Sequence, residues 1–324
     1  MKEFSVIIVS YNTCKITLQC IESIYNTCQD EQFEIIVVDN ASKDDSLIQI
    51  QKNYPKVIIV QNEANLGYAA AVNRGIKLAN SDFFIVSNSD IIFLPNSIQL
   101  LINYLKENPG SAIVGPQQLF PNRKLQRSYN DFHGIKRSLK ELFFINAIEP
   151  ICDSIKKTMN CNFKEKEVEY LDGGVNAIRR TALETINGYD ENFFFYSEEA
   201  DLCYRFKKEG WKVVFLPQSE LIHLRGASSS NEPNKESKEG KTDGIIALAD
   251  SKIRFCKKHH SKGYLPFYIA LQTIYNFSFE LYWKAFSIIF WKKDFSNRLF
   301  YFKNTKKIFY TRFKEKEWKK INTI

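Results

Sequence analysis

Three carboxylates follow a run of aromatic side chains in the stretch Tyr189–Arg205. Glu198, Glu199 and Asp201 lie within four positions, directly after Phe193–Tyr196. Like charges this close repel, and burial beside aromatic rings raises the pKa of a carboxyl group. A carboxyl tuned in this way can act as a general base. The same acids also suit the N-terminus of a helix, where the macrodipole favours negative charge, so the stretch alone leaves both interpretations open.

Polar residues elsewhere follow predicted strands. Strands are expected at 5–9, 34–38, 57–60, 83–86 and 112–115, with helical patterns between them. This alternation with short loops predicts an α/β fold with a parallel sheet. Open sheets of this kind bind ligands at the carboxyl ends of their strands, so the loops that begin at Ser10, Asp39 and Ser87 are expected to converge on one crevice. The absence of a Gly-x-Gly-x-x-Gly or Walker loop in the sequence argues against a dinucleotide enzyme or a P-loop NTPase.

The second half of the predicted catalytic region is less regular. Residues 116–169 suggest an excursion over the crevice, and 170–178 return to the sheet with two adjacent glycines. Such glycines suggest close approach of a backbone or a ligand. We predict a helix over 201–209, ended by Gly210.

The net charge of +8 is confined to one end of the chain. Eleven Lys and Arg residues against three acids between 292 and 320 account for the whole excess, which places no nucleic-acid-binding face on the main domain. The seven cysteines contain no Cys-x-x-Cys pair, so free thiols in a reducing compartment are expected. The first apolar run is too short for a signal peptide, and we expect the active part to be cytoplasmic.

Seven short motifs occur in order along the first two thirds of the chain. They are Val6–Asn12, Val37–Ser42, Asn62–Gly75, Asn88–Asp90, Gly188–Glu191, Tyr196–Arg205 and His223–Gly226. In this order they resemble the motifs of family 2 glycosyltransferases with the GT-A fold, in particular the bacterial rhamnosyltransferase-like branch, over roughly residues 4–228. Each motif alone is weak, but the ordered set is a strong signal. The resemblance implies a GT-A (Rossmann-like) mostly parallel sheet, a nucleotide-sugar donor (a dTDP- or UDP-sugar), Mg²⁺ or Mn²⁺, and inversion at the anomeric carbon.

The resemblance also implies roles for individual residues. Tyr11 and Asn12 look like the loop that meets the base and ribose, and Asp39 like the carboxylate that binds the imide edge of the base. Asp90 resembles the last acid of the Asp-x-Asp metal motif, whose first position is Asn88 here, and His223 falls at the position of a second metal ligand. The expected donor-binding set is Ser10, Tyr11, Asn12, Asp39, Asn40, Asn65, Gly67, Asn73, Asn88 and Arg225.

General chemistry calls for the same residue types. A nucleoside diphosphate leaving group carries concentrated negative charge, which a divalent metal held by carboxylates and phosphates neutralises. A carboxylate with a histidine suits Mn²⁺ somewhat better than an all-oxygen set. A lone histidine such as His223 is also common as a hydrogen-bonded core residue. Arg225 can clamp the diphosphate or form a plain salt bridge on a loop.

The base is assigned by position. The family pattern is Glu-Asp with the second acid as base, and this chain has Glu198-Glu199, so the prediction is Glu199, one methylene longer than usual. Glu198 and Asp201 are the alternative catalytic acids, although Asp201 also suits a helix cap or a pair with Arg205 four positions on. The acceptor site is expected to be shaped by Asp172, Gly173 and Gly174.

The C-terminal region predicts contact with a membrane. Residues 264–291 are strongly apolar, and Gln272, Asn276, Glu280 and Lys284 recur every fourth position, which a helix places on one drifting stripe. We expect an amphipathic helix in the membrane interface; a spanning helix and a helix packed on the catalytic domain are the alternatives. The basic, aromatic segment that follows suits anionic lipid headgroups.

The sequence therefore predicts an inverting, metal-dependent glycosyltransferase of surface polysaccharide synthesis, with a lipid-linked or glycan acceptor. It would lie peripherally on the cytoplasmic face of a bacterial inner membrane and bind no nucleic acid. The expected domains are a catalytic domain at 1–228, a polar linker at 229–243 and a helical extension at 244–324. The alternatives are a sugar-phosphate nucleotidyltransferase, whose Gly-rich loop the sequence lacks, and a nucleotide- or carbohydrate-binding regulatory protein with a degenerate site.

Overall fold

The computed structural model describes residues 2–28, 33–143, 164–224, 238–289 and 294–314. The chain divides into two compact units. The first holds Met1–Asp131, Pro150–Phe194 and Glu198–Pro233, and the second holds Phe132–Glu149, Phe195–Ser197 and Asn234–Ile324. Each unit is considered by itself.

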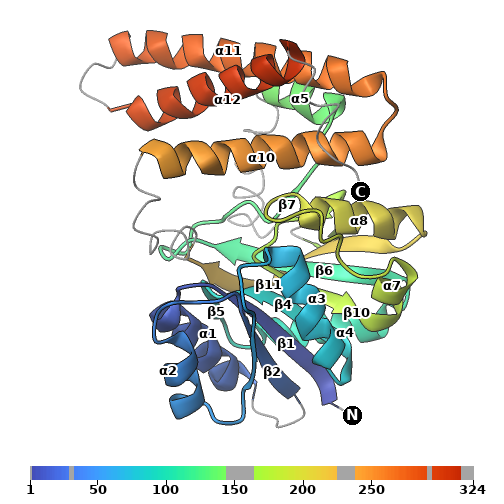
Figure 1. The fold of residues 1–324 in the computed structure, drawn as a ribbon. Helices are drawn as coiled ribbons and strands as arrows, with labels where there is room; N and C mark the ends of the chain where they lie inside the picture. The colour runs from blue at the N-terminus through green and yellow to red at the C-terminus, as the bar shows by residue number, and fades with distance from the viewer. Residues whose placement is uncertain (1, 29–32, 144–163, 225–237, 290–293, 315–324) are drawn as a thin grey trace. The chain divides into compact units, whose positions relative to one another are not determined.

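A nine-stranded sheet, counted over the described residues, forms the centre of the first unit (Figure 1). Its order is β3-β2-β1-β4-β10-β6-β11-β5, with β8 beside β11, and β7 and β9 form a separate pair. The strands are β1 (Lys2–Ser10), β2 (Phe33–Asp39), β3 (Ile58–Gln61), β4 (Ser81–Asn88), β5 (Ile91–Phe93), β6 (Ser111–Leu119), β7 (Tyr129–Asn130), β8 (Lys166–Glu167), β9 (Tyr170–Leu171), β10 (Val175–Arg179) and β11 (Lys212–His223). The helices are α1 (Cys14–Thr27), α2 (Ser46–Asn53), α3 (Tyr68–Leu78), α4 (Ser97–Glu107), α7 (Arg180–Thr185) and α8 (Glu198–Lys208).

Helices cover both faces of this sheet. Successive side chains of a strand point to opposite faces, and in β1 Val6 and Ile8 join the buried cluster that contains the apolar sides of α1 and α4. Ile7 points the other way and meets α3, where a Cβ on Gly75 would lie 2.5 Å from its Cγ2 atom. Burial on both faces explains why β1 is a continuous β-branched run rather than an alternating one.

The sheet is mixed and mostly parallel, as the sequence predicts, with antiparallel strands in its second half. Strands β3, β2, β1 and β4 are parallel neighbours, as are β6 and β11. Strand β10 runs antiparallel between β4 and β6, and β5 and β8 are antiparallel to β11. The reason lies in the turn before β10: the carbonyl of Gly174 accepts a hydrogen bond from the N–H of Asn88 (3.0 Å), so β10 starts at the edge where β4 ends.

Helix α8 begins earlier than the sequence predicts. It spans Glu198–Lys208 rather than 201–209, so Glu198, Glu199 and Asp201 all lie in its first turn, where the helix macrodipole favours acids. The two residues before it, Tyr196 and Ser197, have φ of 72° and 66°. This left-handed conformation is uncommon for non-glycine residues and separates the aromatic run from the helix.

The second unit is helical. It contains α5 (Ile135–Leu142), α10 (Lys238–His259), α11 (Tyr264–Ile289) and α12 (Ser296–Lys314), and α12 packs against both α10 and α11 (Figure 1). Helix α10 begins within the predicted linker 229–243, of which residues 229–237 lie outside the described residues. In the part of the chain that the structure describes, none of the helices combines the length and the apolar character that crossing a bilayer requires.

Helix α11 turns its polar stripe inward. Gln272, Asn276 and Glu280 are buried, with Glu280 only 3% exposed. Gln272 donates to Ser138 Oγ at 2.6 Å, and Glu280 forms salt bridges of 2.6 Å with Lys284 and with a lysine of α12. The stripe that the sequence shows is therefore a real helix face, but it packs on the other helices of its unit, and the opposite, apolar face is exposed.

Candidate active site

The loops after three neighbouring strands lie at one edge of the sheet. Ser10 at the end of β1 is level with Asp39 at the end of β2, and Val9 is level with Asn88 at the end of β4. The predicted convergence of these loops is thus confirmed by the strand register. Asn12 joins the first two loops: its N–H donates to Ser42 Oγ (2.8 Å).

Asp39 is buried with one of its carboxylate oxygens engaged. Oδ1 accepts the N–H of Ser42 at 2.9 Å, whereas Oδ2 has no hydrogen-bond partner among the described residues. Leaving a buried carboxylate oxygen unsatisfied is costly, and an N–H of a bound base would satisfy it. Ser10, by contrast, directs its hydroxyl to Thr13 and Thr17, at 3.1 and 3.0 Å, and belongs to a buried hydroxyl network. The next residue of the predicted donor-binding set, Tyr11, is partly exposed.

The turn before α3 is held by three asparagines. Asn40 Nδ2 donates to the carbonyl of Gly67 (3.2 Å), and Asn40 Oδ1 accepts from Asn62 Nδ2 (2.7 Å). Asn65 Oδ1 accepts the N–H of Gly67 (3.0 Å). Gly67 has φ of 84°, and a Cβ there would lie 2.5 Å from the carbonyl oxygen of Phe194, so both conformation and space require glycine.

Asn73 lies within α3, six residues after Gly67, and has a different environment. Its Nδ2 donates to the carbonyl of Tyr189 and to Glu191 Oε1, both at 2.9 Å, and its Oδ1 accepts the N–H of Tyr189 at 3.0 Å. Both ends of the amide thus hold the loop that leads to the acidic stretch. Asn73 stays in the donor-binding set as a prediction, while its contacts here are those of a loop-positioning residue.

Asp90 and His223 face each other at this edge of the sheet. Asp90 lies in the turn after β4. His223 is the last residue of β11 and pairs with Ile91 of the neighbouring strand β5, the residue after Asp90. His223 Nε2 lies 3.4 Å from Asp90 Oδ1. On its other side, His223 Nδ1 lies 2.7 Å from Gln118 Oε1. Gln118 Nε2 points to the carbonyl of Asp172 (3.4 Å), which fixes Oε1 as the acceptor and Nδ1–H of His223 as the donor.

This hydrogen-bond pattern suits a divalent cation. With Nδ1 directed at Gln118, Nε2 is the ring nitrogen of His223 that faces the Asp90 carboxylate, and a divalent cation between the two groups would have an imidazole nitrogen and a carboxylate oxygen as ligands. Histidine ligands commonly donate their other ring N–H in this way. The described residues hold no cluster of three or more His, Cys, Asp or Glu side chains that could bind a metal, so a metal here would take its remaining ligands from phosphate and water, as Mg²⁺ commonly does.

The predicted acceptor residues lie beside this pair. A Cβ on Gly174 would lie 2.9 Å from Gln118 Oε1, the acceptor of His223. A Cβ on Gly173 would overlap the carboxyl group of Glu199. The turn Asp172–Gly174 therefore connects the surroundings of His223 with Glu199.

Glu198 and Glu199 are adjacent carboxyl groups whose pKa values are both raised. Burial, with the neighbouring charge of Glu199, raises the pKa of Glu198 well above its usual range. Burial raises the pKa of Glu199 to about 7, and the charge of Asp172 acts in the same direction. Both acids and Asp90 also raise the pKa of the buried Tyr68 phenol, after burial itself. The charges of Glu198, Glu199 and Asp90 therefore all act on the Tyr68 side chain.

Asp201 is occupied by an ion pair. Its Oδ2 accepts from Arg205 Nε at 2.7 Å, and Arg205 also donates to the carbonyls of Ile186 and Gly188 at 2.8 and 2.7 Å. The expected pair four positions apart is confirmed, and it ties the helix to the preceding turn. Arg225 lies outside the described residues.

The sequence did not identify Gln118 or Tyr68 as site residues. Gln118 lies in β6, which is buried along its whole length, and an amide in such a strand must have an internal partner. The two adjacent glutamines, Gln117 and Gln118, at the end of the apolar run 112–116 were the available signal. Tyr68 opens α3 within a recognised motif, but nothing in the sequence shows that its ring meets the acids of α8.

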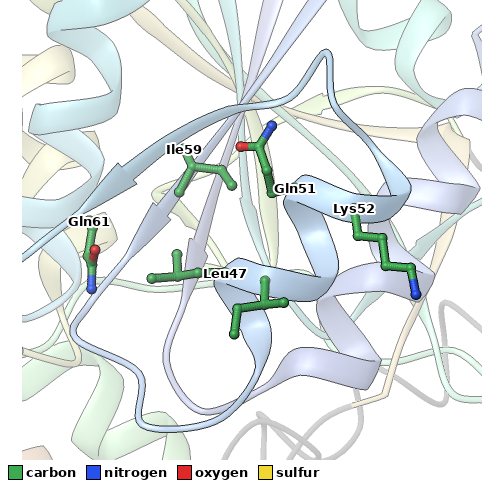
Figure 2. A pocket seen from close by; sticks show the side chains of 6 residues that line it. Leu47, Gln51, Lys52, Ile59 and Gln61 are labelled. Carbon is green, nitrogen blue, oxygen red and sulfur yellow. The ribbon is translucent and has the colours of Figure 1, made fainter.

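The described residues also line cavities that include neither Asp90 nor Glu199. One of about 560 Å³ lies between α2 and β3 and is lined by Leu47, Ile48, Gln51, Lys52, Ile59 and Gln61 (Figure 2). None of the predicted site residues lines it. The other, of about 430 Å³, includes Asn73 and Gly188 with Arg180 and Glu184, on the α7 side of α3.

Comparisons with known proteins found two family models and several relatives that match this chain. Residues 5–186 match the model of glycosyl transferase family 2, and residues 156–226 match that of the N-terminal domain of galactosyltransferase. An N-acetylglucosaminyl-diphospho-decaprenol L-rhamnosyltransferase of Mycobacterium tuberculosis is 27% identical over 234 residues, which are 67% of this chain and 74% of the relative. Rhamnosyltransferase WbbL of Escherichia coli K12 is 25% identical over 225 residues, 67% of this chain and 82% of the relative.

Solved structures share the fold. A mannosyltransferase of Pyrobaculum calidifontis, in complex with GDP-Man and Mn²⁺, aligns with a TM-score of 0.60 at 12% identity, over 97% of this chain and 88% of that one. GalNAc-T7 with UDP, GalNAc and Mn²⁺ aligns with a TM-score of 0.53 at 16% identity, over 68% of this chain and 43% of that one. Both structural neighbours are Mn²⁺-bound.

Proposed function

The chain belongs to glycosyl transferase family 2, and from that premise we propose that it transfers a rhamnose-like sugar or another hexose, with inversion, from a nucleoside diphosphate donor to a lipid-linked or glycan acceptor of bacterial surface polysaccharide. The relatives named as rhamnosyltransferases support the donor class, and the name of the mycobacterial enzyme supports a polyprenyl-diphosphate acceptor. In this proposal residues 1–228 carry the reaction, 244–324 contact the membrane and 229–243 link them.

One observation carries the proposal. The turn Gly173–Gly174 meets Glu199 on one side and Gln118 on the other, and Gln118 is the partner of His223, which faces Asp90; burial raises the pKa of Glu199 to about 7. A carboxylate that takes up a proton near neutral pH is suited to accept the acceptor hydroxyl's proton as the new bond forms at C1. An acid at the diphosphate end would serve the leaving group. This chain of contacts supports placing the base and the residues at the leaving group in one site.

This scheme also gives roles to Asp39, to the pair Asp90 and His223, to Glu198 and to the turn Asp172–Gly174. The free oxygen of Asp39 would accept the imide N–H of a uracil or thymine base, beside Tyr11 and Asn12. Asp90 and His223 would hold Mg²⁺ or Mn²⁺, which when bound would neutralise the charge that develops on the diphosphate. Burial raises the pKa of Glu198, and in its protonated form this residue would add no negative charge beside the base. Asp172, Gly173 and Gly174 would form the wall on the acceptor side.

The second unit would bring this site to its substrate. The exposed side of α11 carries large apolar side chains, among them Phe267 and Ile288, which are 73% and 78% exposed. Such a surface usually marks an interaction site, and an apolar helix face beside a basic segment suits the interface of an anionic membrane. We therefore place the protein peripherally on the cytoplasmic face of the inner membrane, where lipid-linked acceptors are held.

The test is turnover with defined donors. The purified chain is incubated with dTDP-rhamnose or UDP-sugars and a polyprenyl-diphosphate sugar acceptor, with Mn²⁺ or with EDTA, and products are identified by mass. We expect one donor to give a product one deoxyhexose or hexose heavier, only with the metal. Donor binding without any product from the full panel would contradict transfer.

A further inference from the structure

Gly173 has no conformational reason to be glycine. Among the described glycines, Gly67, Gly188 and Gly210 have φ between 76° and 84°, a region that favours glycine. Gly173 is not among the positive-φ residues, so an alanine could adopt its backbone. The requirement for glycine at this position must come from space.

The space in question is filled by Glu199. A Cβ built on Gly173 would overlap both Oε1 and Cδ of Glu199, and would lie 3.1 Å from its Cγ. The carboxyl group of Glu199 thus rests where a side chain at 173 would be. At the adjacent Gly174 the nearest atoms belong to Gln118 instead, so the two glycines do not have the same function.

We propose that Gly173 is a positioning residue for the base. Because Gly173 has no side chain, the space beside it stays open, and the carboxyl group of Glu199 occupies this space when it faces the acceptor. This inference rests on the proposed function for its catalytic part only. Its geometric part concerns two residues of the first unit and holds whatever the substrate is.

The geometry predicts a compensating pair of substitutions. In Gly173→Ala the new methyl group expels the carboxyl of Glu199, because neither group can yield without rotating the glutamate. In Glu199→Asp the carboxyl carbon moves back to about the place of Cγ, 3.1 Å from the same methyl, and rotation about χ2 turns its two oxygens away from that methyl. That separation needs an adjustment of a few tenths of an ångström only. Alanine at 173 should therefore be harmful beside glutamate and nearly harmless beside aspartate.

The experiment is a double-mutant cycle on the full chain, read by kcat, by the Kd of the free nucleoside diphosphate and by Tm. Gly173→Ala should lower kcat about 100-fold, the order of loss from a misplacement of about 1 Å, with the nucleotide Kd unchanged. In the Glu199→Asp background the same substitution should change kcat by less than about threefold, since contacting residues are not additive. Gly110→Ala, where a Cβ meets nothing within 4 Å, is the matched control and should leave all three quantities unchanged.

The thermal readout keeps the two proposals apart. Overpacking should lower Tm by about 5 °C in Gly173→Ala and by much less in Gly173→Ala/Glu199→Asp. If the wild-type chain transfers no sugar, the proposed function fails, and the Tm cycle still tests the contact. An equal loss of Tm or kcat from Gly173→Ala in both backgrounds, or full wild-type activity of Gly173→Ala, would overturn the inference.

Discussion

Glu199 is the residue on which transfer should depend most. Replacing it with glutamine keeps the shape but removes the carboxylate that we propose accepts the acceptor's proton. We expect Glu199→Gln to lower kcat by about 10²–10⁴-fold, the usual contribution of a general base, while the Kd of UDP or dTDP changes little. Glu209→Gln, at an exposed position just after α8, is the matched control. Wild-type turnover in Glu199→Gln would remove this residue from the mechanism.

The raised pKa of Glu199 predicts two opposite pH effects. The base works only when ionised, so kcat should rise with pH through about 7. For stability the sign is reversed: the folded state holds this proton more tightly than the unfolded chain, so the carboxyl favours folding at low pH and this contribution is lost as pH rises through about 7. Glu199→Gln should therefore raise Tm more at pH 8 than at pH 5. A Tm difference independent of pH would show that the pKa is ordinary.

Gln118 should tune the metal site although it touches no metal. Its Oε1 accepts the Nδ1–H of His223, which fixes the ring and the tautomer. Residues in this position typically contribute about 10–100-fold to metal affinity. Gln118→Met should weaken Mn²⁺ binding by that order in the presence of UDP, measured by calorimetry, whereas Gln99→Met on the exposed side of α4 should not. Unchanged Mn²⁺ affinity in Gln118→Met would mean that His223 is not a ligand.

At the residue scale, motifs made Asp90, His223 and Glu199 candidates because these residues lie in short, recognisable segments. Sequence spacing could not show that Gln118 bridges His223 to the turn at Asp172, because that relation joins three strands far apart in the chain. It also could not show that the side-chain amide of Asn73 forms hydrogen bonds with the backbone of Tyr189. Such contacts depend on register and side-chain direction, which only the folded structure fixes.

At the element scale, the period of α11 was predictable but its orientation was not. Polar residues every fourth position define a face, and the natural expectation is that it meets water. The structure buries that face because Gln272 has Ser138 as partner and Glu280 has Lys284 and Lys306. A sequence pattern shows that two faces differ; the partners that neighbouring helices offer decide which one turns inward.

The exposed face of α11 should bind lipid. Ile274, Leu281 and Ile288 recur every seventh position and are exposed, so they lie on one side. Replacing all three with glutamine should not disturb the packing of the second unit, and should weaken binding to vesicles by at least about tenfold, since each buried aliphatic side chain contributes about 1.5–3 kcal/mol. Vesicle co-sedimentation measures this, with exposed Ile48→Gln as control. Undiminished binding of the triple variant would exclude this face.

At the scale of the whole molecule, the N-terminal half of the sheet followed from the sequence, because each buried parallel strand is an apolar run followed by a helix. The antiparallel insertion of β10 did not, because nothing in Val175–Arg179 distinguishes an antiparallel from a parallel strand. The mixed sheet nevertheless serves the site: it brings the glycine turn before β10 against the end of β4, where Asp90 begins the next turn.

The uneven charge of the chain predicts how its membrane binding responds to salt. The whole excess of +8 lies between 292 and 320, and α12 carries part of it, with Lys306 and Arg312 already paired to acids of the same unit. Unpaired cations near an anionic surface contribute about 1 kcal/mol each. The full chain should bind vesicles containing phosphatidylglycerol about 100-fold more tightly than phosphatidylcholine vesicles at about 0.05 M salt.

Raising salt to about 0.5 M should remove most of this difference, because the Debye length becomes only a few ångströms. The binding due to the apolar face should remain. Equal affinity for both vesicles at low salt would show that the basic segment does not face the membrane.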